Sequence, residues 1–96
     1  MEYYNNLNNF KVDDIVCIEG DSIFPTLVKL PIGFLNHDGM HFDAEKIVYK
    51  DTDNKCYQYA PGNGCGMLST ERVRKATKQE IDIYNKLTHD VWQIEY

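Results

Sequence analysis

The sequence contains no long apolar run, and no stretch approaches the roughly 20 consecutive apolar residues that a membrane-spanning helix needs. Its first residues, Met-Glu-Tyr-Tyr-Asn-Asn, have neither the basic nor the apolar region of a secretory signal peptide. We therefore expect a soluble, cytoplasmic protein that has no membrane partner.

Cysteine and basic residues are also few. The three cysteines, Cys17, Cys56 and Cys65, cannot all pair within one chain, so we expect free thiols in a reducing compartment. Ten basic residues stand against fifteen acidic ones, which gives a formal net charge of −5. This charge disfavours a general nucleic-acid binder, because phosphate contacts need clustered Lys and Arg.

The rest of the amino-acid composition is typical of one ordered domain. Ninety-six residues leave room for a single core, and 43% hydrophobic and 12% aromatic residues can form it without a metal or a disulfide. Residues 1–9 are polar and rich in Asn, which favours turns, and we interpret them as a tail or a loosely docked turn. The predicted domain is then 10–96.

Short stretches rich in β-branched and aromatic residues, separated by turn signals, predict several strands. Pro25 and Pro31 confine a strand near them to a sheet edge or a strand start. Asp38-Gly39 predicts a tight hairpin turn that leads into a return strand. The predicted strands are 10–18, 26–30, one that begins at 40–42, 46–50, 55–60, and a short one near Val73.

The hydrophobic period changes at Thr77. Thr77 and Glu80 have the spacing of a capping box, and Ile81, Tyr84 and Leu87 share one helical stripe, so we predict a helix near 78–88. The alternation over 91–96 favours a final strand. The predicted core includes Val12, Val16, Ile18, Leu27, Val28, Ile47, Val48, Val73, Ile81 and Tyr84.

Two strings carry a resemblance to a known group of proteins. Phe10-Lys11-Val12-Asp13-Asp14-Ile15-Val16 resembles the opening F-K-V-G-D-x-V strand of SH3-like barrels found in small proteins of tailed phages and prophages. Phe24-Pro25-Thr26-Leu27-Val28-Lys29-Leu30 then precedes Asp38-Gly39, as an aromatic-Pro-x-x-V strand precedes a D-G turn in those proteins. Here Asp13 replaces the turn glycine, and Gly33 stands where the pattern has Ser or Thr.

The order of elements and the resemblance together predict a mainly β fold, a small SH3-like antiparallel barrel with one short C-terminal helix over an open end. The resemblance also implies a phage-type accessory protein, which acts in the cytoplasm of the host cell.

Metal binding and catalysis have weak support. His37, His41, Cys56 and Cys65 are ligand types that zinc accepts, but eight residues separate the two cysteines, unlike the paired ligands of structural zinc sites. Cys65 has no nucleophile signature around it, and the carboxylates are scattered singly. We predict no metal, no cofactor and no enzymatic activity.

A second interpretation is a barrel module that binds nucleic acid or a nucleotide-like small ligand. The glycine string around Gly62, Asn63 and Gly64 could cradle a phosphate, although it lacks the Lys-Ser/Thr pair of a Walker loop, and a hairpin or Ω-type loop is the simpler interpretation. Tyr57 and Tyr59 could stack on bases. The basic residues of this alternative face are Arg72, Arg74 and Lys75.

The favoured interpretation is contact with a protein through an acidic surface. Residues 1–60 hold ten acidic residues against five lysines, whereas residues 61–96 hold five of each sign. Carboxylates in turns could project together and imitate spaced phosphates toward a basic host protein, such as a nuclease or a defence effector. The alternative explanation is that Asp simply favours turns. The predicted contact residues are Asp13, Asp14, Glu19, Asp21, Asp51 and Asp53.

Overall fold

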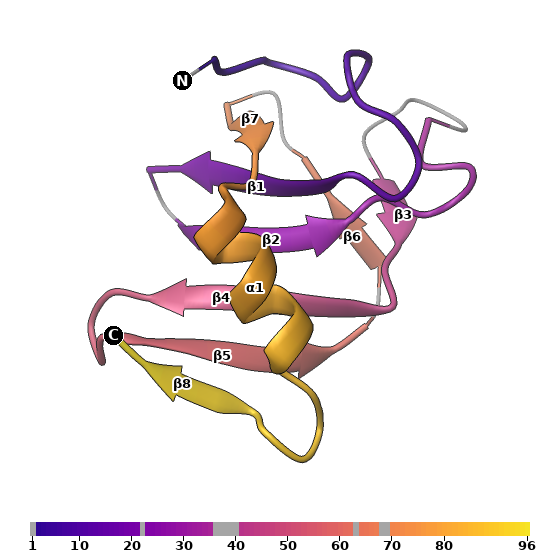
Figure 1. Cartoon of the computed structure of the whole chain (residues 1–96). Helices are drawn as coiled ribbons and strands as arrows, with labels where there is room; N and C mark the ends of the chain where they lie inside the picture. The colour runs from indigo at the N-terminus through magenta and orange to yellow at the C-terminus, as the bar shows by residue number, and fades with distance from the viewer. Residues whose placement is uncertain (1, 22, 36–40, 63, 68–69) are drawn as a thin grey trace.

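The computed structural model describes residues 2–21, 23–35, 41–62, 64–67 and 70–96, and Figure 1 shows the whole chain. The described elements are, in chain order, β1 (Ile15–Gly20), β2 (Ile23–Lys29), β3 (His41–Asp43), β4 (Lys46–Asp51), β5 (Cys56–Pro61), β6 (Gly64–Gly66), β7 (Arg72–Lys75), α1 (Lys78–Lys86) and β8 (Gln93–Glu95). The nine-residue α1 is too short and too polar to cross a membrane, and the described residues contain no other helix.

The strands form an antiparallel six-stranded sheet with the order β7-β1-β2-β4-β5-β8, and a separate two-stranded ribbon of β3 and β6. The predicted mainly β, antiparallel fold with one short helix is therefore confirmed. The pairings found among the described residues leave β7 and β8 at the two edges of the sheet. The N-terminal segment adds a bridge to one of these edges, between Tyr4 and Val73.

The sheet buries apolar side chains on both faces, because alternate residues of a strand point to opposite sides. On one face, Tyr84 and Leu87 of the helix region join Leu27 and Val48 in one core cluster. Figure 1 shows α1 lying across β1, β2, β4 and β5. The helix was predicted to cover an open barrel end, and it packs on a sheet face instead because its apolar stripe meets the apolar side chains of the central strands.

The opposite face is covered by segments that are distant in the sequence. Its core cluster combines side chains of the central strands with side chains of the N-terminal segment, of the turn after β2 and of the β3–β6 ribbon. The covering residues are Leu7, Phe10, Phe34, Phe42 and Met67. The described N-terminal residues are therefore docked through Leu7, whose side chain is only 1% exposed, which agrees with the docked turn and not with a free tail.

The glycine string forms a corner and a strand where an open loop was expected. The β4–β5 hairpin continues into the β3–β6 ribbon, and the Gly62 backbone N–H donates to the Glu45 carbonyl over 3.0 Å at the bend. A Cβ atom at Gly62 would lie 1.8 Å from the carbonyl oxygen of Ala44. The missing side chain thus lets the two backbones approach and lets the ribbon fold over the sheet.

Three predicted strands differ from those observed, and the second of them, predicted over 26–30, is β2 at Ile23–Lys29. The first begins at Ile15 instead of Phe10, because Asp13 adopts a left-handed φ of 74° and the Asp14 N–H donates to the Lys11 carbonyl, which makes a turn. The strand after the predicted hairpin, β3, pairs with β6, while β2 pairs with β4. The predicted turn at Asp38-Gly39 lies outside the described residues.

Pro25 lies inside the central strand β2, where it was not expected. The register of β1 against β2 shifts between Ile18 and Gly20, and the pairing with β4 begins only at Thr26. Pro25 therefore occupies an irregular position at which no partner strand needs its missing N–H.

The predicted core is largely correct. Val12 is the exception, with 42% of its surface exposed in the turn before β1, and Ile81 is half-buried; the other predicted core residues are buried. The Thr77–Glu80 capping box is present, the final strand β8 pairs with β5, and α1 ends at Lys86, two residues earlier than predicted. Lys46 Nζ donates to the carbonyls of Tyr84 and Leu87, which satisfies the end of the helix.

Candidate functional site

The predicted acidic contact residues do not form one surface. Because β1 and β4 are both antiparallel to β2, they run in the same direction. Asp13 and Asp14 precede the start of β1, whereas Asp21 follows its end and Asp53 follows the end of β4. The carboxylates therefore lie at two opposite ends of the sheet.

Three of the six carboxylates are engaged by other groups of the molecule, and one of them is Asp14, whose Oδ2 accepts from the Lys11 backbone N–H over 2.9 Å. Asp51 is buried, and its side chain accepts hydrogen bonds from the backbone N–H groups of Asp53 and Asn54 and from the side chains of Asn54 and Gln58. These bonds, first of all the one from the Asn54 side chain, lower the pKa of the Asp51 carboxyl. Glu19 faces Arg74, with 3.4 Å between Oε2 and Nε. Only Asp13, Asp21 and Asp53 of the six are exposed.

Two residues of the predicted basic and aromatic face, Arg74 and Tyr57, are buried. Arg74 is buried, and its Nη1 and Nη2 donate to the two carboxylate oxygens of Glu80 over 2.7 and 2.9 Å. These bonds raise the pKa of the guanidinium. Tyr57 is buried in the cluster beneath α1, where burial raises the pKa of its hydroxyl. Neither residue is available to phosphate or to a base.

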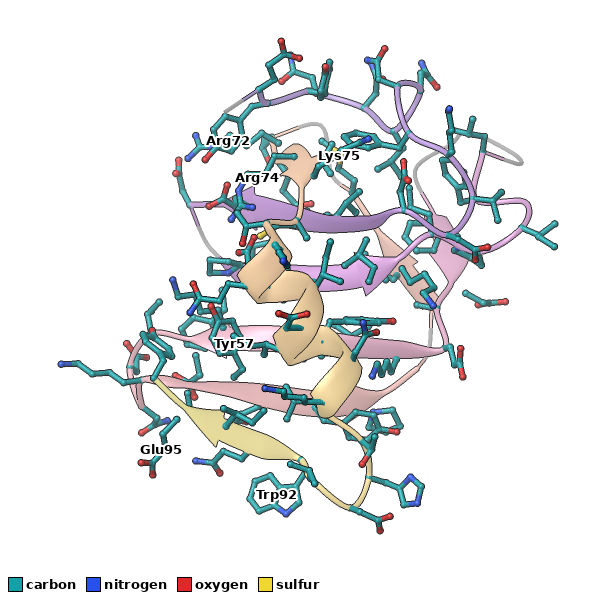
Figure 2. All side chains as sticks on the ribbon, viewed as in Figure 1. Tyr57, Arg72, Arg74, Lys75, Trp92 and Glu95 are labelled. Carbon is teal, nitrogen blue, oxygen red and sulfur yellow. The ribbon has the colours of Figure 1, made fainter. Side chains whose placement is uncertain are left out.

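The other residues of that face are dispersed. Figure 2 shows Arg72 and Lys75 on β7, at one edge of the sheet, and Trp92 and Glu95 at the opposite edge. The guanidinium of Arg72 lies 4.8 Å from the centre of the Tyr3 ring, and Lys75 is exposed. Tyr59 is half-buried against the cluster beneath α1, Gly62 forms the corner, and Gly64 begins β6. Asn63 lies outside the described residues.

A groove lies at the sheet end where β1 ends and β2 begins. It consists of two adjoining hollows of about 540 and 210 Å³ that share Ile23 and Tyr49. The larger hollow is also lined by Asp21, Phe24 and Thr52. The smaller one reaches Thr26 of β2 and the three residues of β6. We call this feature the Phe24 groove.

The Phe24 groove combines apolar walls with an acidic lining. Its walls Ile23, Phe24 and Tyr49 remain 39, 37 and 37% exposed, which is high for large apolar side chains on adjacent strands. Among the described residues that line the two hollows, the charged ones are Asp21, which is exposed, and Glu71, which is buried. Such a lining favours a ligand that has apolar and positively charged groups.

Sequence reasoning did not identify the walls of this groove. Phe24 was used only in the aromatic-Pro string of the resemblance, Tyr49 was part of a predicted strand, and Ile23 was assigned to no site. The available signal was Tyr49 itself, which alternates with buried Val48 and therefore faces away from the helix. That β2 and β4 are neighbours, and so bring Thr26 opposite Tyr49, needed the structure.

The thiols and histidines offer no catalytic constellation among the described residues. Burial raises the pKa of the Cys17 thiol to about 12 and also raises that of Cys65, so both stay protonated and weakly nucleophilic at neutral pH. Within the described parts of the chain, no three His, Cys, Asp or Glu residues lie close enough together to hold a metal ion. His37 lies outside those parts.

Comparison with known proteins adds no assignment. No family model matches the chain, and neither the curated proteins nor the solved structures contain a match to it.

Proposed function

We propose that this chain is a non-catalytic interaction protein that binds a basic protein and inhibits or modulates it. The observation that carries the proposal is the Phe24 groove, in which exposed apolar side chains lie beside an exposed carboxylate, Asp21. Burial of the apolar walls would supply affinity, and the negative charge would steer a positively charged partner.

The charged residues in the interior support a binding role over catalysis. Arg74, Glu80 and Glu19 join α1, β7 and β1, and Asp51 holds the β4–β5 turn. Each of these charged groups is engaged in a structural contact within the protein. Of the predicted contact carboxylates, the exposed ones remain available to another molecule, as does the groove.

The acidic contact surface is smaller than the sequence indicated. Asp21 lines the groove, and Asp53 lies in the turn next to Thr52, which also lines it. We assign partner contact to these two carboxylates and not to Asp13 and Asp14 at the other sheet end. The resemblance to phage proteins supports a host factor as the partner, such as a nuclease or another defence effector.

The alternative function, binding of nucleic acid or of a nucleotide-like ligand, has less support. It relied on Tyr57 and Arg74, which are buried, and on a glycine loop that instead forms a corner and β6. A gel-shift assay at low salt, with single-stranded and double-stranded nucleic acid, tests it directly, and saturable binding would revive it.

The test of the proposed function uses two isosteric variants that each remove one exposed turn carboxylate. A partner is first captured from a bacterial host lysate and purified, and its affinity for wild type, Asp21→Asn and Asp13→Asn is measured by titration calorimetry. We expect Asp21→Asn to weaken binding about fivefold or more, and Asp13→Asn to leave it unchanged. Raising the salt from about 0.05 to 0.5 M should weaken wild-type binding through screening.

Two outcomes of these binding measurements would contradict the proposal. If Asp21→Asn and Asp13→Asn bind like wild type at both salt concentrations, neither the groove nor its charge contributes to the contact. If both variants lose affinity equally, net charge matters and the groove does not.

A further inference from the structure

The strand edges of the molecule differ in how they are protected against pairing with another chain. Edge strands are commonly shielded by charged side chains, by proline or by a covering segment. β7 carries Arg72 and Lys75 and is bridged by Tyr4, β8 carries Glu95, and β3 carries Asp43. β6 has the sequence Gly-Cys-Gly, with neither a charge nor a proline.

β6, the strand without a charge or a proline, borders the groove. Among the described residues, β6 pairs only with β3, and its three residues line the smaller hollow together with Thr26 and Tyr49. Gly64 and Gly66 have no side chains, so another backbone can approach β6 closely from the groove side.

We propose that the partner enters the Phe24 groove as an extended segment and pairs with β6 as an added strand. This inference rests on the proposed function and specifies its binding mode. The segment alternates apolar with basic residues, so that apolar side chains meet Ile23 and Tyr49 while basic ones reach Asp21. Main-chain hydrogen bonds to β6 fix its direction, and the acidic lining selects its charge.

The shortness of β6 determines how the affinity is divided. Three residues can offer only a few main-chain hydrogen bonds, and each contributes little net affinity because it replaces a hydrogen bond to water. The apolar walls must therefore supply most of the affinity, and the strand pairing supplies the geometry. A helical ligand would use the walls alone and leave the β6 backbone without a partner.

The experiment selects peptide ligands directly and does not require the partner to be identified. Displayed random peptides of about eight residues, enough for one strand, are enriched on wild type and counter-selected on Tyr49→Ala. We expect enriched peptides in which apolar and basic residues alternate with period two. Enrichment of helical i, i+3, i+4 spacing, or of no peptide at all, would overturn the inference.

A backbone modification then tests strand pairing itself. An enriched peptide is synthesised with N-methyl groups at odd or at even positions, and binding is measured by titration with amide chemical-shift mapping of the protein. We expect one methylated set to lose about tenfold or more in affinity while the other binds normally, because only alternate N–H groups face β6. The amide signals of Gly64, Cys65 and Gly66 should shift on binding.

Matched variants separate this inference from the function on which it rests. Tyr49→Ala should abolish peptide binding, whereas Trp92→Ala, which removes an exposed aromatic next to β8, should not. If Asp21→Asn weakens binding of the captured partner but N-methylation has no effect, the groove function stands and strand pairing is wrong. If the peptide binds as described but the captured partner ignores Asp21→Asn, the proposed function is wrong.

Discussion

Asp13 has a φ of 74°, a left-handed conformation that costs a residue with a Cβ atom about 1–2 kcal/mol. Its backbone N–H donates to the Leu30 carbonyl over 2.8 Å, so the turn is tied to the end of β2. Asp tolerates this region better than most residues, and glycine tolerates it best. The resemblance to the F-K-V-G-D pattern places glycine at this position.

We predict that Asp13→Gly is more stable than Asp13→Ala by about 1 kcal/mol, because both remove the carboxylate and only Ala keeps the Cβ atom. Urea unfolding followed by circular dichroism measures the difference. Equal stability of the two variants would mean that residue 13 does not adopt a left-handed conformation.

The second prediction at the residue scale concerns the carboxyl group of Glu80. Burial alone would raise its pKa, but hydrogen bonds from the Arg74 side chain and the Thr77 backbone N–H hold the pKa below its ordinary value of 4.5. A depressed folded-state pKa contributes stability that is present above the ordinary value and is lost as the pH falls through the folded-state value. Wild type should therefore lose stability as the pH falls below about 4.5.

Glu80→Gln should remove this part of the pH dependence and cost about 3 kcal/mol at pH 7, because buried Arg74 loses its bidentate partner. Urea unfolding over a pH series compares the variant with wild type. Glu95→Gln, on exposed β8, controls for the change in net charge. A variant as acid-sensitive and as stable as wild type would rule out the Arg74–Glu80 pair as a stabilising contact.

At the scale of elements, the corner at Gly62 places β6 over the sheet and so builds one side of the Phe24 groove. Gly62→Ala should destabilise the protein by about 3 kcal/mol or more, because the new Cβ atom would overlap backbone oxygens that cannot move independently. Thermal and urea unfolding measure the loss.

Gly20→Ala is the matched control for the corner. Its added Cβ atom would lie 3.0 Å from Cγ of Glu71, part of a flexible side chain. We expect a clearly smaller loss than at Gly62. If the two substitutions cost the same, the close approach of the two backbones at the corner is not what requires glycine.

At the scale of the whole molecule, the N-terminal segment completes the core on the face opposite α1. Leu7 is buried in one core cluster with Phe10, Leu30 and Phe34, two of which follow it by more than twenty residues. We predict that Leu7→Ala costs about 3 kcal/mol through lost burial and the cavity left behind. Ile32→Ala, at a side chain that is 89% exposed, should change the unfolding free energy little. A Leu7→Ala variant as stable as Ile32→Ala would show that residues 1–9 are a dispensable tail.

The sequence by itself determined the features that depend on neighbouring residues. The Thr77–Glu80 spacing specified the helix start, and alternation indicated β8. Stretches of β-branched and aromatic residues between turn signals indicated β4 and β5 and a mainly β, antiparallel domain with most of its core. Tertiary structure decided which strands pair, which carboxylates are engaged in contacts within the protein, and where exposed apolar side chains meet. Asp51 and Asp53 look alike in the sequence, yet one is held by four hydrogen bonds and the other is exposed. Local patterns cannot make that distinction, because it depends on contacts such as Thr26 with Tyr49 or Gly62 with Ala44, which chain folding creates between distant positions.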